Sequence, residues 1–396
     1  MREGSVVSAV FLYDDAYLQY QFSPDHPFNP VRLSATRDLA ENFGLLSPDD
    51  VIPPRPATID ELELAHSPHY VDLVRRISVT GKKTYGIERL GLGTEDNPVF
   101  RGMHEAAALA AGGTLTAAEK IVAQQTSRAL NLAGGLHHAG HGHASGFCIY
   151  NDVVAAIRWL RRETGWRVLY VETDAHHGDG VQDAFYRDPE VFFVSLHESG
   201  AFLFPGTGHV DEIGEGAGLG TTVNVPLAPA TDDASWLEAF QSVVPRVMER
   251  FQPDIVISQH GCDGHYWDPL ADMCATTTFY AAVPRLLSQW VDAYGINRWI
   301  AVGGGGYQSL SVVPRVWTLL WAAVSRQDLQ DRPISPDWLA AWEPQSPSRL
   351  PRHLMDEPEQ FPPIRDRQRM VKANRDTLAA LAQQFPEMRF GVSGKA

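Results

Sequence analysis

The sequence predicts an α/β protein with three layers, in which a central, mainly parallel sheet is flanked by helices. Short apolar, β-rich runs alternate along the chain with longer stretches whose apolar residues recur at three- and four-residue spacing. This alternation is typical of strand–helix–strand units, whose strands pair in parallel and are buried on both faces. With 396 residues, 44% of them hydrophobic, the chain is long enough to bury such a core, and extensive disorder is excluded.

The first strand is expected at 8–12, because this apolar run is followed at once by Asp14 and Asp15 and fits a strand better than a signal peptide. Further short apolar runs predict buried strands at 167–172, 191–196, 221–225, 254–258 and 298–302. Helical spacing of apolar residues predicts helices at 104–122, 152–162, 234–250, 278–294 and 310–325.

One domain over residues 1–325 is predicted, since neither an internal repeat nor a break in composition occurs before residue 325. The chain then becomes rich in proline and charge up to about residue 363. Residues 326–396 are therefore expected to form an extension that packs on the domain and contains a last amphipathic helix at 366–384.

Charge and composition exclude several classes of protein. Lys and Arg number 33 against 48 Asp and Glu, a net charge of −15, which disfavours direct binding of nucleic acid. No apolar segment approaches the ~20 residues that span a bilayer, so no membrane partner is expected. Three cysteines are too few for a disulfide framework in a chain of this length. We therefore expect a soluble, cytoplasmic protein, whose oligomeric state the sequence leaves open.

A candidate metal site follows two of the predicted strands. Asp174 and His176 alternate in an extended segment and so point the same way, while Asp263 follows the strand at 254–258 at the same sheet edge. Two carboxylates and one imidazole leave a coordination position open for water, as in a catalytic site for Zn²⁺, although Fe²⁺ also suits oxygen ligands. Each residue alone fits a loop cap or a core histidine, but unpaired burial of all of them would cost several kcal/mol each.

A tandem pair, His137 and His138, lies in the run GGLHHA at 134–139. Adjacent side chains diverge, so the pair suits two roles near a metal-bound water better than one shared ion: one ring accepts the proton and the other stabilises charge. Glu172 and Asp179 are the carboxylates available to orient these rings. His141 and His143 are interpreted as surface or loop-stabilising residues.

The run GGGGY at 303–307 joins the last predicted strand to a helix. It has neither the GxGxxG pattern nor the Lys-Ser/Thr of a phosphate-binding loop. Its glycines permit close approach of the backbone to a pocket, where the Tyr307 hydroxyl would donate to a substrate carbonyl. Packing alone explains this tyrosine about equally well.

Taken in order, these motifs resemble the zinc-dependent deacetylase family that includes the histone deacetylases. The matching runs span most of residues 10–325 and are GGLHHA at 134–139, SGFCIYND at 145–152, HHGDGV at 176–181, FPGTG at 204–208 and GGGGY at 303–307. Within the family, the run GTEDNP at 93–98 and the segment 102–115 most resemble the bacterial acetoin-utilization deacetylases.

The resemblance implies an arginase/deacetylase-like fold and removal of acetyl groups from lysine side chains of proteins. It implies Asp174, His176 and Asp263 as zinc ligands, His138 as general base and acid, His137 as its electrostatic companion, and Tyr307 as the carbonyl-polarising donor. Asp179 and Glu172 would support the histidines. The implied substrate-binding residues are Asp96, Gly146, Phe147, Phe204, Leu270, Gly305 and, near an inner acetate pocket, Arg32. A structural K⁺ near Asp174, His176, Ser195 and Leu196 is also implied.

Two departures from the family pattern bear on function. Glu172 stands where the family usually has Asp beside the first histidine, which affects both that partnership and the geometry around the potassium ion. Leu270 stands at the rim where polyamine-specific relatives carry Glu, which favours acetyl-lysine over an acetylpolyamine. The acidic surface suggests a basic or neutral target such as a metabolic enzyme.

Three alternatives to this activity remain. An acetylpolyamine deacetylase keeps the chemistry and changes the substrate. A ureohydrolase of the same fold needs two manganese ions and additional aspartates, but His265 stands where the middle Asp of its second motif would be. A non-catalytic acyl-lysine-binding protein is disfavoured because the candidate ligands, both histidines and Tyr307 are all present.

Overall fold

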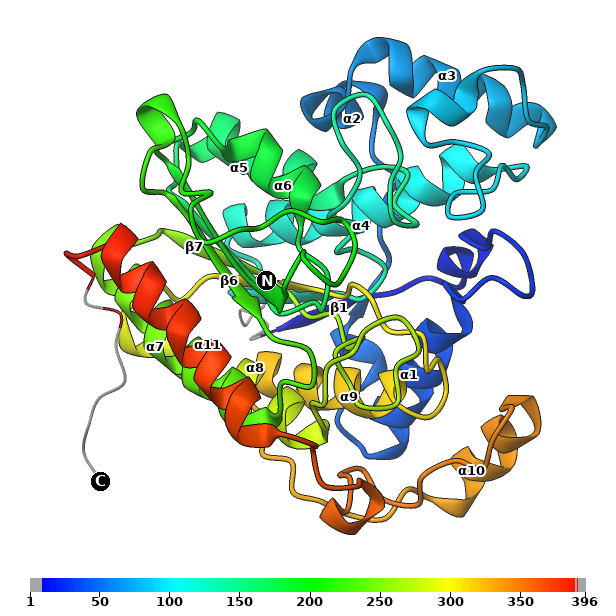
Figure 1. The fold of residues 1–396 in the computed structure, drawn as a ribbon. Coiled ribbons are helices and arrows are strands. Elements are labelled where there is room, and N and C mark those ends of the chain that lie inside the picture. The colour runs from blue at the N-terminus through cyan, green and yellow to red at the C-terminus, as the bar shows by residue number, and fades with distance from the viewer. Residues whose placement is uncertain (1–8, 389, 391–396) are drawn as a thin grey trace, which may run out of the picture.

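One eight-stranded sheet forms the centre of the molecule. The computed structural model describes residues 9–388 and 390. Its strands are β1 (Val10–Leu12), β2 (Val51–Ile52), β3 (Arg128–Asn131), β4 (Val168–Glu172), β5 (Val191–Glu198), β6 (Thr222–Leu227), β7 (Ile255–Gln259) and β8 (Trp299–Val302). They pair in parallel in the order β2-β1-β3-β8-β7-β4-β5-β6 (Figure 1). The carboxyl ends of all these strands therefore meet at one edge of the sheet.

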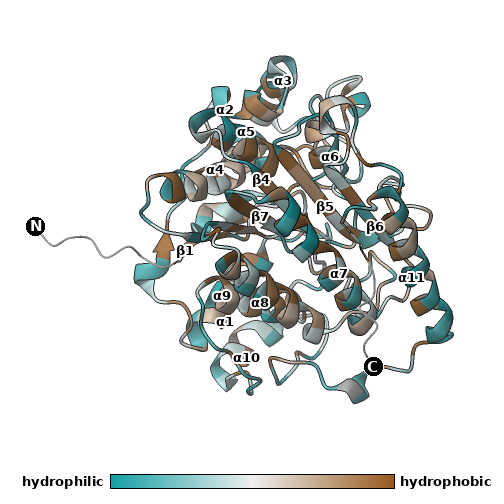
Figure 2. Cartoon of the chain, turned by 90° about the vertical axis from the view of Figure 1, so that its left-hand side faces the viewer, coloured by the Kyte–Doolittle hydropathy of each residue, from teal (hydrophilic) through white to brown (hydrophobic). Residues whose placement is uncertain are grey.

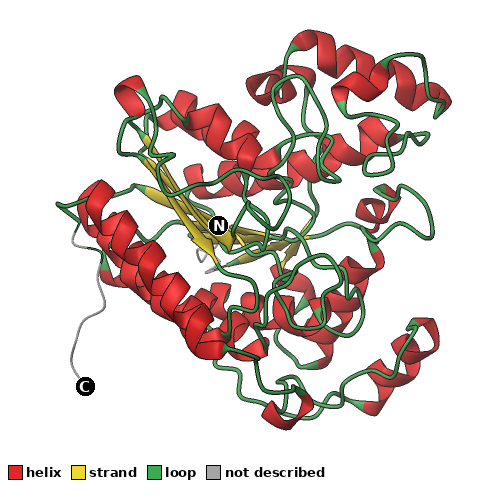
Figure 3. Cartoon of the chain, viewed as in Figure 1, coloured by secondary structure: helices red, strands yellow, loops and turns green. Residues whose placement is uncertain are grey.

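Helices cover both faces of this sheet (Figure 3). On one face lie α4 (Met103–Val122), α5 (Asp152–Thr164) and α6 (Asp179–Phe185), with α2 (Ile59–Ala65) and α3 (Pro68–Thr80) outside them. On the other face lie α1 (Val31–Asn42), α7 (Asp233–Phe251), α8 (Thr277–Ala293) and α9 (Val313–Val324). The predicted three-layer α/β architecture is thereby confirmed.

The core is divided by the sheet because successive strand residues face opposite sides. In β4, Leu169 and Val171 pack in the cluster that contains α7, α8 and α9, whereas Val168 and Tyr170 pack in the cluster that contains α5 and α6. The strands are correspondingly hydrophobic along their length, while the outer helix surfaces are polar (Figure 2). Burial on both faces explains why these strands are apolar runs without alternation.

The predicted elements are present, and their ends agree with the prediction or differ from it by at most three residues. The first strand begins at Val10, and residue 8 of the prediction lies outside the described residues. Sequence reasoning missed β2, β3 and helices α1, α2, α3 and α6. Neither strand forms an apolar run of its own: β2 has only two residues, and β3 begins with Arg128 and ends with Asn131. Asn131 in β3 is nevertheless buried and accepts a hydrogen bond from Tyr17 at 2.9 Å, so tertiary contacts hold this strand.

The C-terminal segment, which is the described part of the chain after residue 325, runs back across the molecule. It contains α10 (Pro336–Trp342), which was not predicted, and α11 (Arg367–Gln384), which was. Helix α11 lies along α7 (Figure 1), where the Asn374 amide donates to Thr231 Oγ1 at 2.8 Å and Ser235 Oγ at 2.9 Å. The domain boundary at residue 325 stays a prediction.

Among the described residues, no helix has the length and apolar character needed to cross a membrane.

Candidate active site

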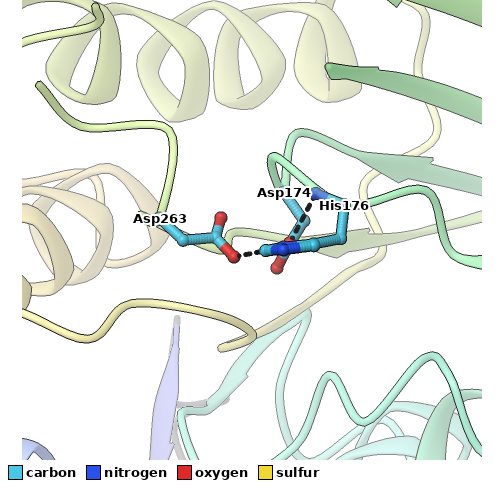
Figure 4. Close-up of side chains that lie close together, drawn as sticks. All are labelled: Asp174, His176 and Asp263. Carbon is cyan, nitrogen blue, oxygen red and sulfur yellow. Dashed lines mark hydrogen bonds and ion pairs between the residues drawn. The ribbon is translucent and has the colours of Figure 1, made fainter. Parts of the chain in front are cut away.

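Three side chains from two loops converge at the carboxyl edge of the sheet (Figure 4). Asp174 and His176 follow β4, and Asp263 follows the neighbouring strand β7. The Nδ1 atom of His176 lies 3.2 Å from Asp174 Oδ1 and 2.8 Å from Asp263 Oδ2. All three residues are buried, and their candidate ligand atoms lie within 4.8 Å of one another. Within the described part of the chain, no other cluster of His, Cys, Asp and Glu meets this test.

The remaining oxygen of each carboxylate is held by the protein. Gln259 Nε2 and the backbone N–H of Gly305 donate to Asp174 Oδ2 at 2.7 and 2.8 Å. The backbone N–H of Ala175 donates to Asp263 Oδ1 at 2.8 Å. One oxygen of each aspartate is thus left facing the same imidazole nitrogen, and two adjacent buried carboxylates repel each other unless a cation lies between them. This donor set fits a divalent metal ion with two carboxylate ligands and one histidine ligand.

The two tandem histidines are held by different carboxylates. His137 Nδ1 donates to Glu172 Oε2 at 3.0 Å, and His138 Nδ1 donates to Asp179 Oδ1 at 2.7 Å. Burial lowers the pKa of His137, but the charges of Glu172 and Asp174 outweigh burial and raise this pKa to about 9. Burial and the neighbouring His137 lower the pKa of His138 to about 4. The first ring is therefore the cationic member of the pair and the second is neutral.

Glu172 is held by the backbone and by a second side chain in addition to His137. Its Oε2 atom accepts a hydrogen bond from the Tyr170 hydroxyl at 2.8 Å, and its Oε1 atom accepts one from the Gly178 N–H at 2.6 Å. A Cβ atom at Gly178 would lie 2.2 Å from Glu172 Oε2, so only glycine leaves room there for the glutamate. The Glu172 carboxylate is thus placed against His137 by two further donors, the Tyr170 hydroxyl and the Gly178 N–H.

A cavity of about 240 Å³ opens above these residues. Its lining consists of Leu203 and eight of the predicted site residues, namely Asp96, His138, Gly146, Phe147, His176, Phe204, Leu270 and Tyr307. The Phe147 and Tyr307 rings meet edge to face at 5.6 Å, and the Phe204 ring meets His138 in the same way at 5.1 Å. Phe204 is 46% exposed and stands at the mouth. Phe147, Phe204 and Tyr307 therefore give the cavity aromatic walls, and His138 and His176 add two imidazoles to its lining.

The glycine loop before Tyr307 passes directly over the two aspartates of the candidate metal site. A Cβ atom at Gly305 would lie 2.0 Å from Asp263 Oδ2, so the loop passes at a distance that only glycine permits. The backbone N–H of Tyr307 donates to Asp268 Oδ2 at 2.8 Å. This bond fixes the start of the side chain, and the ring then lines the cavity.

Arg32 and Asp96 occupy opposite ends of the site. Arg32 is buried below the cavity, where Nη1 donates to the Gly306 carbonyl at 2.9 Å and the guanidinium lies 4.3 Å from the Phe28 ring centroid. Asp96 lines the cavity, and its backbone carbonyl accepts a hydrogen bond from His26 Nε2 at 3.2 Å. Arg32 does not line the 240 Å³ cavity.

Of the residues suggested for potassium, Ser195 and Leu196 do not line the cavity, whereas His176 does. Ser195 and Leu196 belong to β5, and Ser195 pairs with Glu172 in the sheet. His197 Nε2 lies 3.0 Å from the Gly208 carbonyl, which can only accept, so Nδ1 of the neutral ring accepts from the Ser195 hydroxyl at 2.7 Å. With its hydrogen donated to His197, the Ser195 hydroxyl oxygen can act as a cation ligand, and hydroxyl, carbonyl and carboxylate oxygens suit a hard ion.

Several supporting residues have no signal in the sequence. Gln259, Asp268 and Tyr170 hold site residues through hydrogen bonds, yet each lies in a segment that reads simply as strand or loop. For Tyr170 the alternation of side chains along a strand gives a clue. Tyr170 lies two residues before Glu172, so the two side chains lie on the same face of the sheet. His141 and His143 are exposed on a loop outside the site, as interpreted from the sequence.

Comparison with known proteins relates the chain to one family over most of its length. The profile of the histone deacetylase domain matches residues 26–324. The acetoin utilization protein AcuC of Bacillus subtilis (strain 168) is 44% identical over 371 residues, which cover 94% of this chain and 96% of that protein. AcuC of Staphylococcus xylosus is 39% identical over 364 residues, covering 92% and 94% of the two chains.

Solved structures show the same fold. The crystal structure of an HDAC homologue complexed with SAHA superimposes with a TM-score of 0.83 at 28% sequence identity, covering 93% of this chain and 99% of that one. The crystal structure of an HDAC homologue from Aquifex aeolicus gives a TM-score of 0.81 at 27% identity, with the same coverage.

Proposed function

Because the chain belongs to the histone deacetylase family, and is a deacetylase-family hydrolase similar to AcuC, we propose that it removes acetyl groups from lysine side chains of proteins and releases acetate. The observation that carries this proposal is the convergence of a buried Asp-His-Asp group, His138 and Tyr307 on one aromatic-walled cavity. Such a cavity suits a long, mostly apolar side chain that ends in an amide.

Asp174, His176 and Asp263 would hold a divalent ion, Zn²⁺ by preference and Fe²⁺ as the alternative. A bound ion supplies two things in such a site: polarisation of the amide carbonyl and a water molecule acidic enough to attack at neutral pH. Gln259 and Gly305 then act on Asp174 by fixing its other oxygen, which orients the ligand.

His138 is proposed as the group that moves the proton. Its Nδ1–H is committed to Asp179, so the lone pair on its Nε2 atom, which faces His137 Nε2 at 3.0 Å, would exchange that contact for the attacking water, take the water's proton and return it to the departing lysine amine. His137, bound to Glu172, supplies positive charge next to that nitrogen, since the two Nε2 atoms lie 3.0 Å apart. Glu172 thus favours the protonated form of His137, whereas burial and the neighbouring His137 keep His138 neutral.

Tyr307 is proposed to donate its hydroxyl to the oxygen of the reacting amide. The ring lines the cavity beside Phe147, and its backbone is held by Asp268. Donors of this kind stabilise the negative charge that develops on a carbonyl oxygen in the transition state. Burial raises the pKa of Tyr307 well above its usual value, so the hydroxyl keeps its proton and remains a donor.

The cavity walls would bind the lysine stem. Gly146, Phe147 and Phe204 line the passage, Leu270 lies at the rim, and Asp96 would bind the substrate backbone there. Gly305 would lie over the reacting group, and Arg32 would lie near the outgoing acetate. A K⁺ ion beside Asp174, His176, Ser195 and Leu196 is proposed as a structural ion, supported by the oxygen donors of that place.

A protein substrate is supported by the surroundings of the tunnel mouth. A second cavity of about 220 Å³ shares Tyr307 with the first, and a third of about 620 Å³ shares Gln308 and Ser311 with the second. A polypeptide on either side of the acetyl-lysine would occupy such neighbouring depressions, whereas an acetylpolyamine would not need them. We propose a cytoplasmic protein target, such as a metabolic enzyme. The cysteines of the described chain are all free, which is consistent with a reducing compartment.

The ureohydrolase alternative is not supported at position 265, where that enzyme would need a ligand for its second metal ion. His265 donates through Nε2 to Asp356, at 2.9 Å, and is not a member of the Asp174, His176 and Asp263 group.

Hydrolysis of a fluorogenic acetyl-lysine peptide by metal-quantified protein tests the proposal, with acetylspermidine as a parallel substrate. We expect peptide turnover that a metal chelator stops. Turnover of acetylspermidine alone would overturn the protein-substrate assignment, and no turnover of either substrate by metal-loaded protein would overturn the activity.

A further inference from the structure

A buried carboxylate from the C-terminal segment lies against the loop that carries Asp263. The side chain of Asp356 is 2% exposed and bridges two partners: His265 Nε2 at 2.9 Å and Arg315 Nη1 at 2.7 Å. The backbone N–H of Thr277 donates to the same carboxylate at 2.9 Å, and Asp356 N–H donates to Thr277 Oγ1 at 2.7 Å. Asp356 is thus fixed by donors from the loop, from α8 and from α9.

His265 transmits this contact to the loop at 262–268, here called the ligand turn. Its Nδ1 atom accepts the Trp267 N–H at 3.2 Å, so the ring hydrogen is on Nε2 and is donated to Asp356. The His265 side chain is fully buried. Its backbone N–H donates to the Cys262 carbonyl at 3.3 Å, and its carbonyl accepts the Asp268 N–H at 2.7 Å.

Both ends of the ligand turn reach the candidate active site. At one end, Asp263 faces His176. At the other end, Asp268 Oδ2 accepts the backbone N–H of Tyr307 at 2.8 Å, and Oδ1 accepts that of Leu270 at 3.0 Å. A displacement of the turn would therefore move a metal-ligand candidate, the start of the Tyr307 side chain and the rim residue together.

We propose that Asp356 is a positioning residue for the active site, which acts through His265 on the ligand turn and makes the C-terminal segment part of the catalytic architecture. Asp356 lies 32 residues beyond the end of the region that matches the histone deacetylase domain, residues 26–324. The contact between Asp356 and His265 therefore involves a residue that lies outside the region shared with the family. The inference deepens the proposed function and rests on it for the chemistry at Asp263 and Tyr307.

The physical reason is that the contact is buried and charge-assisted. The Arg315 side chain is 1% exposed, so removal of its carboxylate partner leaves a cation without compensation in the interior. An asparagine at position 356 would keep one acceptor oxygen, so either the His265 N–H or the Arg315 guanidinium would face an N–H donor in place of its acceptor. Burial raises the pKa of Asp356, but the hydrogen bond from His265 and the charge of Arg315 outweigh burial and hold that pKa well below its usual value.

The test uses Asp356→Asn in the full chain, with Zn²⁺ affinity measured by chelator competition and kinetics measured on the acetyl-lysine peptide. We expect Zn²⁺ to bind about 10-fold more weakly or worse, and kcat of the zinc-saturated variant to fall about 10-fold, because loss of an outer-shell partner has this scale. KM should stay within about twofold, since the tunnel walls are untouched.

Asp292→Asn is the matched control. Asp292 also pairs with a buried arginine, Arg128 at 2.7 Å, and with Arg326 of the C-terminal segment at 2.7 Å. Arg128 begins β3, at the opposite edge of the sheet from the site. This variant should lose thermal stability yet keep the native Zn²⁺ affinity and kcat. Equal losses of affinity and kcat in both variants would show a general effect of destabilisation and overturn the proposal.

A double variant separates action through His265 from other effects. If Asp356 acts through that ring, Asp356→Asn combined with His265→Gln should weaken Zn²⁺ binding no further than the stronger single change does. Fully additive losses, or native Zn²⁺ affinity and kcat in folded Asp356→Asn protein, would refute the proposed role. Failure of the wild-type chain to hydrolyse the peptide would instead count against the proposed function, because Zn²⁺ affinity is measured independently of turnover.

Discussion

The Nε2 atoms of His137 and His138 lie 3.0 Å apart, and each ring is held at its other nitrogen by a different carboxylate. Two such nitrogens can approach this closely only when one donates and the other accepts. The charged ring beside Glu172 is the donor, and the neutral ring beside Asp179 is the acceptor. Neighbours in the sequence are thereby given unequal chemistry, because Glu172 and Asp174 favour the charged form of His137, while burial and the neighbouring His137 keep His138 neutral.

This asymmetry predicts unequal losses on mutation. His138→Asn should lower kcat by about 10²–10⁴, the usual contribution of a general acid–base residue. His137→Asn should have a smaller effect, because it removes a stabilising charge and leaves the proton carrier. Steady-state kinetics on the acetyl-lysine peptide at matched zinc content will compare the two variants. A larger loss for His137→Asn would reverse the assigned roles.

Tyr307→Phe should lower kcat by about 10²–10³, the usual effect of removing one oxyanion donor. The ring would still pack against Phe147, and the backbone bond to Asp268 does not involve the hydroxyl. Metal content and thermal stability should therefore match those of the wild-type chain. A fall in kcat of less than about threefold would exclude the hydroxyl as the donor to the carbonyl.

Removal of the metal should abolish hydrolysis. After dialysis against a chelator, about one equivalent of Zn²⁺ per chain should restore activity, since a single Asp-His-Asp group is present in the described residues. Elemental analysis and titration of activity provide the measurement. Asp263→Asn should weaken metal binding, and a requirement for two equivalents would instead favour the binuclear ureohydrolase alternative.

Leu270→Glu should shift selectivity toward a cationic substrate. Leu270 lines the cavity at the rim, so a carboxylate there would attract the amines of acetylspermidine. We expect the ratio of kcat/KM for acetylspermidine to that for the peptide to rise about 10-fold or more, and Leu270→Gln is the uncharged control. An unchanged ratio would show that this rim position does not select the substrate.

Asp233 predicts a pH dependence of stability that is unrelated to the active site. Thr276 donates to it twice at 2.7 Å, yet burial raises its pKa to about 6. A folded-state pKa above the unfolded value of about 3.9 stabilises the fold at low pH, and this contribution is lost as the pH rises through about 6.

Asp233→Asn removes the pH-dependent loss of stability while it keeps a side-chain oxygen that accepts from Thr276. Between about pH 4.5 and pH 8, the free energy of unfolding of the variant relative to wild type should therefore rise by about 1–2 kcal/mol. Urea unfolding at the two pH values will measure this difference. The same offset at both pH values would contradict the raised pKa.

The sequence by itself determined the architecture and the place of the chemistry. Apolar runs separated by helical periodicity predicted a parallel sheet, and polar clusters after the runs at 167–172, 254–258 and 298–302 predicted where its loops would meet. The alternation of Asp174 and His176 in an extended segment was enough to place them on one side. These inferences depend on local spacing, which the printed sequence contains in full.

The tertiary structure decided which groups meet across the chain. Asp263 Oδ2 comes within 2.8 Å of His176 although 87 residues separate them, and Asp356 reaches His265 across 91 residues. The tertiary structure also decided the hydrogen bond from Gln259 to Asp174 and the position of the short strand β3, which has no periodicity of its own. Such pairings depend on strand order and on the path of the C-terminal segment. Local propensity does not encode them, because they form only when the sheet brings distant loops to one edge.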